Sequence, residues 1–195
     1  MGRLAALAIA CMLAALAAGC ASSPARFYTL SAAATPGAAS SKLSVAVGPV
    51  SIPAAVDRPQ IVVSTSANQV ALDDFNRWAS PLQDNLARVV AENLVALLGT
   101  PRVTLFPQTL NADVDYRVQI EIRNFESAPG KSASLDAVWA VRRTKDGKTE
   151  TGRTSVREKV DDNGYEALAA AHSRGVARLS QDIADAVRTL DRGAP

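Results

Sequence analysis

The chain has 195 residues and a net charge of +2, and it contains two cysteines, Cys11 and Cys20, both near its start. This length suits one domain with targeting segments, and a charge so close to neutrality argues against a nucleic-acid-binding protein. Because no cysteine follows Cys20, a disulfide within the rest of the chain is excluded.

The first twenty residues have the three parts of a secretory signal. Arg3 gives a basic start, residues 4–16 are almost entirely apolar, and small residues precede Cys20. The apolar run is shorter than the about 20 residues of a transmembrane helix. The ending Ala-Ala-Gly-Cys resembles a bacterial lipoprotein signal, which implies cleavage between Gly19 and Cys20 and acylation of Cys20. An ordinary signal peptide with a chance cysteine is the alternative.

These features divide the chain into a signal peptide at 1–19, a lipidated tether at 20–25 and a single periplasmic domain at 26–195. By resemblance to the lipoprotein sorting rule, Ala21 in place of aspartate implies the periplasmic face of the outer membrane. Several acyl chains on one cysteine hold a domain at a membrane, where a single chain is marginal.

The first half of the domain is expected to form short strands. Residues 27–30 are aromatic and β-prone, whereas 31–42 are mostly small and polar and predict a flexible loop. Residues 43–47 alternate apolar and polar positions as a half-buried strand does. Residues 60–65 and 70–72, separated by a turn sequence, predict a hairpin.

A helix is predicted directly afterwards. Ser80 with Gln83 fits a capping box, Pro81 fits the first helical position, and Gly99 fits the end of the helix. Leucines and valines between Leu82 and Leu98 follow helical spacing and form one apolar stripe.

The second half combines strands with a long helix. A short strand is expected at 102–106 and an alternating strand at 113–123, with a bulge or a strand end near Asn124. A hairpin of 132–143 and 149–160 around Asp146–Gly147 is expected next. A helix with a stripe from Leu168 to Leu190 follows, and Asn163 with Glu166 fits its cap. The predicted fold is α+β, a mainly antiparallel sheet with two amphipathic helices packed on one face.

Residues suited to catalysis are scarce. His172 is the only histidine, and its spacing from Leu168 and Val176 places it on the packing face of a helix. The pairs Asp73–Asp74 and Asp161–Asp162 lie where aspartate usually caps a turn or helix. With no second histidine or free thiol, the usual metal sets and nucleophile–base pairs are absent from the sequence. We therefore expect no enzyme, cofactor or metal.

Two stretches are hard to explain by packing alone. Residues 57–62 place Arg58, Pro59 and Gln60 between strands, and residues 75–82 place Arg77, Trp78 and Pro81 before a helix. Turn formation and cover for the helix start are one explanation. Tryptophan and arginine are also enriched where proteins bind each other, so a partner-binding surface is the other.

The same stretches carry a family resemblance. The order FYTL, VAVGPVSIPAAVDRPQIV, FNRWASPL and AENLVALLG after a lipoprotein signal resembles the ABC-type transport auxiliary lipoproteins, and among them those of paraquat-inducible (Pqi) membrane-integrity systems. By position, the resemblance implicates a set of residues in this surface: Pro49, Arg58, Pro59, Gln60, Ile61, Trp78, Pro81 and Leu82.

The resemblance implies a non-enzymatic lipoprotein that assists an MCE-type lipid transport system and so maintains membrane integrity. Its implied partners are an MCE-family tunnel protein and the inner-membrane transporter complex. A structural lipoprotein that stabilises the envelope without a transport role is the alternative. The exposed edge expected at 149–160 could also join copies into a homo-oligomer.

Overall fold

The structure is a computed structural model that describes residues 2, 24–37, 41–107 and 113–193. Gly19, Cys20 and nearly all of the expected signal peptide and tether lie outside the described residues. In chain order the elements are β1 (Arg26–Tyr28), β2 (Val45–Ser51), β3 (Gln60–Ser66), β4 (Gln69–Trp78), α2 (Leu82–Leu98), β5 (Val103–Leu105), β6 (Tyr116–Ala128), β7 (Ser132–Arg143), β8 (Thr149–Lys159) and α3 (Tyr165–Arg192).

The larger sheet has the strand order β5-β2-β6-β7-β8. Strands β6, β7 and β8 are antiparallel, whereas β2 runs parallel to both β5 and β6. Of the two alternatives near Asn124 the structure has the bulge, because the β6–β7 register shifts between Ile122 and Asn124 and β6 continues to Ala128. The edge position of β8 is confirmed as well, and the joining of copies through it stays a prediction.

The turn between β7 and β8 lies at the predicted place but is longer than a two-residue hairpin. The backbone N–H of Arg143 donates to the oxygen of Lys148, which leaves four residues in the loop. Gly147 has a φ of 74°, a conformation that glycine adopts without steric cost.

The smaller sheet has the order β1-β4-β3 and contains the predicted β3–β4 hairpin. Strand β4 continues to Trp78, beyond the residues that alternation indicates. An irregularity in the β3–β4 pairing interrupts it, where the side chain of Asp73 accepts hydrogen bonds from the backbone N–H groups of Phe75 and Asn76, each at 2.9 Å. These bonds satisfy backbone donors that have left the regular ladder.

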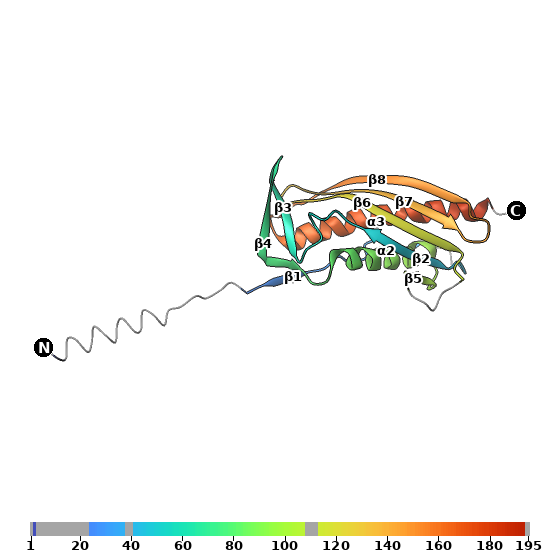
Figure 1. Ribbon diagram of the computed structural model, residues 1–195, viewed down its shortest axis with the longest axis horizontal. Coiled ribbons are helices and arrows are strands. Elements are labelled where there is room, and N and C mark those ends of the chain that lie inside the picture. The colour runs from blue at the N-terminus through green and yellow to red at the C-terminus, as the bar shows by residue number, and fades with distance from the viewer. Residues whose placement is uncertain (1, 3–23, 38–40, 108–112, 194–195) are drawn as a thin grey trace.

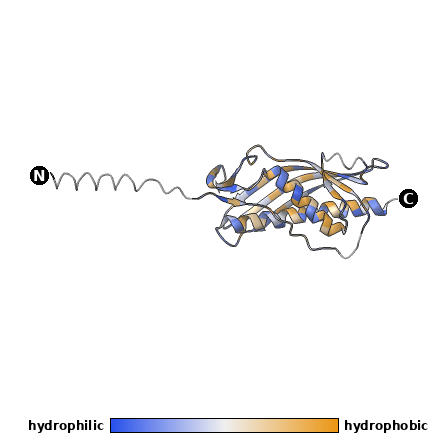
Figure 2. Ribbon diagram, turned by 90° about the horizontal axis from the view of Figure 1, so that it is seen from below, coloured by the Kyte–Doolittle hydropathy of each residue, from blue (hydrophilic) through white to orange (hydrophobic). Residues whose placement is uncertain are grey.

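Both helices pack side by side against one face of the larger sheet, as predicted (Figure 1). Each apolar stripe is buried, and the opposite side of each helix is polar (Figure 2). Fully burying a leucine or valine contributes roughly 1.5–3 kcal/mol, so these stripes supply much of the core. The predicted α+β class, with two helices on one face, is confirmed.

The predicted caps are wrong at both helix starts. The oxygen of Pro81 accepts from the N–H of Asn85, and that of Gly164 accepts from Leu168, so Pro81 and Gly164 are the N-cap residues. Ser80 and Asn163 therefore stand one position too early, and neither N-cap residue makes a side-chain capping bond. The αL conformation of Gly99 at the end of α2 is confirmed.

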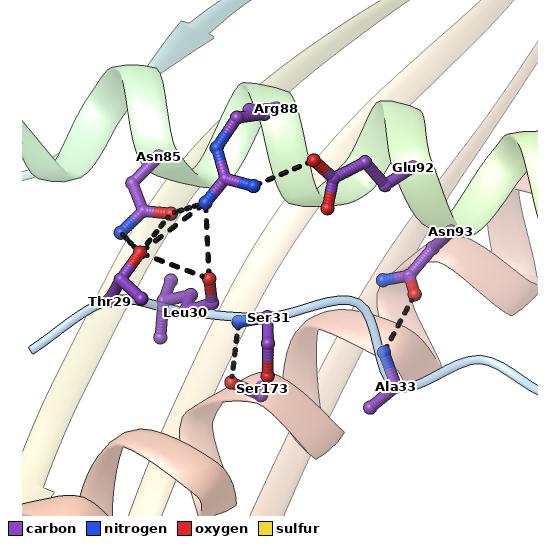
Figure 3. A network of polar contacts seen from close by, with 9 residues as sticks. All are labelled: Thr29, Leu30, Ser31, Ala33, Asn85, Arg88, Glu92, Asn93 and Ser173. Carbon is purple, nitrogen blue, oxygen red and sulfur yellow. Dashed lines mark hydrogen bonds and ion pairs between the residues drawn. The ribbon is translucent and has the colours of Figure 1, made fainter.

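The start of the segment expected to be a flexible loop lies along the two helices (Figure 3). The N–H of Ser31 donates to Ser173 Oγ at 3.1 Å, and those of Ala33 and Ala34 both donate to Asn93 Oδ1 at 3.0 Å. We call residues 29–37 the strap. Its contacts differ from those of a free loop because its backbone donors meet polar side chains of α2 and α3.

Further bonds fix both ends of the strap. Gly37 N–H donates to the oxygen of Ala96, and Leu30, which is fully buried, accepts from Arg88 through its backbone oxygen. Arg88 also pairs with Glu92 at 2.7 Å on the exposed side of α2. The strap thus connects β1 to the helix pair at a defined position.

Candidate partner-binding site

A groove of about 380 Å³ lies between the turn before β3 and the start of α2. It is lined by Asp57, Arg58, Pro59, Trp78, Ala79, Ser80 and Pro81. The structure therefore brings together the two stretches that the sequence singles out, although about twenty residues separate them. Whether they bind a partner stays a prediction.

Backbone hydrogen bonds hold the two walls of the groove together. The N–H of Trp78 donates to the oxygen of Pro59 at 2.8 Å, and that of Ala79 donates to the oxygen of Tyr28 at the same distance. The groove is therefore formed by loops at the ends of strands, and of its lining residues only Trp78 lies on a strand. Its shape depends on the register of β4 against β1 and β3.

Trp78 is the buried floor of this groove. Its side chain is only 5% exposed and packs edge-on against the ring of Phe125, with centroids 6.2 Å apart. Arg58, Pro59 and Pro81 are exposed around it. Packing explains the side chain of Trp78, whereas burial does not explain the exposed side chains of Arg58, Pro59 and Pro81.

Gln60 and Arg77 do not line the groove. They stand opposite each other on β3 and β4, and both contact Asp74. Arg77 Nε donates to the backbone oxygen of Asp74 at 2.7 Å, and Gln60 Nε2 donates to its Oδ1 at 3.4 Å. Of the residues implied by resemblance, Ile61 and Leu82 are core residues, each 1% exposed.

A polar contact that the sequence does not indicate fastens this end of the molecule to α3. Tyr165 donates its hydroxyl hydrogen to Asp73 Oδ2 at 2.7 Å, and its ring lies 5.8 Å from that of Tyr28. Burial alone would raise the pKa of Asp73, but the bonds from Tyr165, Asn76 and nearby backbone N–H groups outweigh it and lower that pKa. Asp73 is thus ionised and fixed.

His172 occupies the packing position that its spacing predicts. The ring is 1% exposed, stacks on Phe125 at 3.9 Å and places Nε2 2.8 Å from Ser127 Oγ. Burial lowers its pKa to about 3, so the ring is neutral at physiological pH. A nearly inaccessible neutral imidazole suits a structural role.

In the part of the chain that the structure describes, no helix combines the length and the apolar character needed to span a membrane.

Comparison with known proteins identifies the family but no curated relative. Residues 28–184 match the family described as ABC-type transport auxiliary lipoprotein component. A search of the curated proteins finds no match.

Two solved structures share the fold. A crystal structure of an uncharacterised protein is 21% identical, with a TM-score of 0.69 over 84% of this chain and 99% of its own. Protein XCC0632 from Xanthomonas campestris is 18% identical, with a TM-score of 0.68 over 86% of this chain and 99% of its own. At these identities the likeness concerns the fold alone.

The family match covers most of the chain, including the groove, α2 and most of α3. The protein therefore belongs to the ABC-type transport auxiliary lipoprotein family.

Proposed function

We propose that this protein is the non-enzymatic auxiliary lipoprotein of an MCE-type lipid transport system of the Pqi kind. Acylated Cys20 anchors it at the periplasmic face of the outer membrane, and the groove binds an MCE-family tunnel protein that connects to the inner-membrane transporter. Such an assembly maintains membrane integrity. Family membership supports the transport role in general, and the lipoprotein signal supports the anchor.

The groove is the observation that carries the partner-binding part of this proposal. It unites parts of two stretches that carry the family resemblance, and it leaves Arg58, Pro59 and Pro81 exposed around a buried tryptophan. Because the prolines have fixed φ angles and backbone hydrogen bonds from Trp78 and Ala79 hold the walls, little conformational entropy is lost when a partner binds here.

The chemistry of the groove indicates what it would accept. Arg58 is exposed and, among the described residues, its side chain makes no ion pair or hydrogen bond, so its guanidinium is available for a carboxylate of the partner. An apolar side chain of the partner fits beside Pro59 and Pro81. Arginine near an apolar centre is typical of protein interfaces.

The test is capture of the MCE-family tunnel protein by the acylated lipoprotein. We expect Arg58→Ala to weaken capture by about tenfold or more, which corresponds to about 1.4 kcal/mol. The matched control is Arg142→Ala, because Arg142 is also exposed but lies on β7 of the larger sheet and does not line the groove. If Arg58→Ala captured the tunnel protein as well as Arg142→Ala does, the groove would not be its binding site.

The anchor is tested separately. Cys20→Ser should abolish incorporation of labelled fatty acid and release the protein from the outer-membrane fraction, whereas Cys11→Ser should change neither. A labelled Cys20→Ser protein would contradict the assignment of the lipid to this sulfur.

The absence of enzymatic activity is a proposal as well. It rests on the single histidine of the sequence, which is buried against Phe125 and Ser127. A hydrolytic activity that disappears in His172→Ala while the fold is retained would overturn it.

A further inference from the structure

The outer face of the smaller sheet is unusually apolar. Among the described residues six large hydrophobic side chains are exposed, and four of them lie on β1 and β4. These four are Phe27, 64% exposed, Val70, 60%, Leu72, 48%, and Phe75, 47%. Exposed apolar residues that lie together on one face mark an interaction surface more often than single scattered residues do.

Strand register shows that this face points away from the core. Ile61 and Val63 of β3 are buried, so their neighbour Val62, which pairs with Leu72, faces the opposite side. Ser64 pairs with Val70 on that same side.

The same reasoning places Phe27 on this face. Tyr28 pairs with the buried Trp78, which faces the core. Phe27 and its partner Arg77 stand one position earlier on each strand and therefore face the opposite side. We call Phe27, Val62, Val70, Leu72 and Phe75 the apolar face.

Polar side chains beside the apolar face have hydrogen-bond partners at Asp74. Arg77 and Gln60 both donate to Asp74, through the two bonds described above. Each of these side chains thus has one partner within the sheet, which contact with an apolar phase would not remove.

The apolar face also lies close in sequence to the proposed anchor. Phe27 follows Cys20 by seven residues, a length of chain that spans at most about 25 Å when fully extended. On the other side of β1 the strap is bonded to α2 and α3, so β1 does not move freely relative to the domain. If Cys20 carries lipid, the bilayer surface is therefore always within reach of this face.

We infer that the apolar face docks on the lipid bilayer that holds the anchor. This inference rests on the proposed acylation of Cys20. Two phenylalanines with three aliphatic side chains suit the interfacial region, where an apolar surface enters the headgroup–acyl boundary by about 5–10 Å. A short tether keeps the bilayer at high effective concentration, so a modest contact area is sufficient.

The experiment places a reporter on the face of the full acylated protein. Leu72→Trp and, as a second position, Val70→Trp are reconstituted into vesicles of phosphatidylethanolamine and phosphatidylglycerol, with or without dibrominated acyl chains. Val95→Trp on α2 is the matched control, because Val95 is apolar and 38% exposed but lies away from the smaller sheet. Trp78 and Trp139 contribute the same background in all variants.

We expect brominated lipid to quench at least about half of the added emission at positions 72 and 70, because such side chains would lie at the headgroup–acyl boundary. Emission at position 95 should be unchanged. Equal quenching at all three positions, or none at 72 and 70 in variants whose circular dichroism is native, would overturn the inference.

Emission at 72 that shifts to the blue without quenching and follows protein density would mean that a second copy covers the face, which also overturns it. Mass spectrometry of the same samples shows whether Cys20 is acylated. An acylated protein without quenching would contradict only this inference, whereas a protein lacking acyl chains would contradict the proposed anchor.

Discussion

Asn93 of α2 donates from its Nδ2 to Ser180 Oγ of α3 at 3.3 Å, inside the interface between the two helices. Its Oδ1 meanwhile accepts the backbone N–H groups of Ala33 and Ala34. One buried amide therefore joins three segments that are far apart in the sequence.

Replacing this amide tests its role in the strap. Asn93→Ala leaves two strap amides and Ser180 with fewer partners, and we expect the free energy of unfolding to fall by about 1–3 kcal/mol. Hydrogen exchange at Ala33 and Ala34 should become faster. Urea denaturation and exchange measurements check this, with Glu92→Ala, on the exposed side of α2, expected to change stability by less than about 0.5 kcal/mol. Unchanged exchange in Asn93→Ala would show that the strap is held by other contacts.

His172 predicts how stability depends on pH. Its pKa is about 3 in the folded protein and about 6.5 when unfolded, so below pH 6.5 the unfolded chain binds the proton and the folded chain does not. The free energy of unfolding should therefore decrease as the pH is lowered, by about 2 kcal/mol from pH 7.5 to pH 5. Because the sequence has no other histidine, His172→Gln should remove most of this slope. A wild-type stability that is flat over this range would be inconsistent with a neutral buried ring.

Trp78 should matter more to the fold than Arg58 does. Trp78→Ala removes a buried ring from the contact with Phe125 and should cost about 3–5 kcal/mol, as large core truncations do. Arg58→Ala changes an exposed side chain and should stay within about 0.5 kcal/mol. Thermal unfolding of both variants measures the difference. A variant whose melting temperature is unchanged can be used to measure partner binding without an effect of unfolding. Similar melting temperatures would mean that the groove floor is not part of the core.

Gly152 is predicted to be a site where even one methyl group is too large. A Cβ at this position would lie 2.2 Å from Cζ2 of Trp139, whose indole Nε1 donates to Thr154 Oγ1 at 3.1 Å. Gly152→Ala should displace the indole, cost about 1–3 kcal/mol and alter tryptophan emission. The neighbouring Thr151→Ala, on an exposed side chain, is the control and should leave both unchanged. Native stability in Gly152→Ala would show that the indole can move aside freely.

Periodicity predicts the parts of the fold whose side chains alternate between core and solvent. The β6 series from Val118 to Ile122, the bulge at Asn124 and the leucine stripes of both helices follow directly from spacing, because burial imposes that spacing. The strap was not predictable in this way. Its contacts use backbone N–H groups, and composition says nothing about whether Asn93 and Ser173 will face them.

The candidate site shows the same division. Sequence reasoning finds Arg58, Trp78 and their neighbours as unusual residues, and the structure adds that Pro59 and Trp78 are bonded to each other. Sequence reasoning does not anticipate that Arg77 donates a hydrogen bond to the backbone oxygen of Asp74. Distances across a sheet depend on register, and the β3–β4 pairing contains an irregularity that no local pattern reveals.

The pairing of β1 with β4 has a mechanical consequence. The two strands run parallel, and three consecutive residues from Arg26 to Tyr28 are in register with β4. A force applied at Pro24 along the strand loads these hydrogen bonds together, in shear, instead of opening them one after another. Tension on the N-terminal segment would thus be spread over the whole strand and then passed through the strap into the helices.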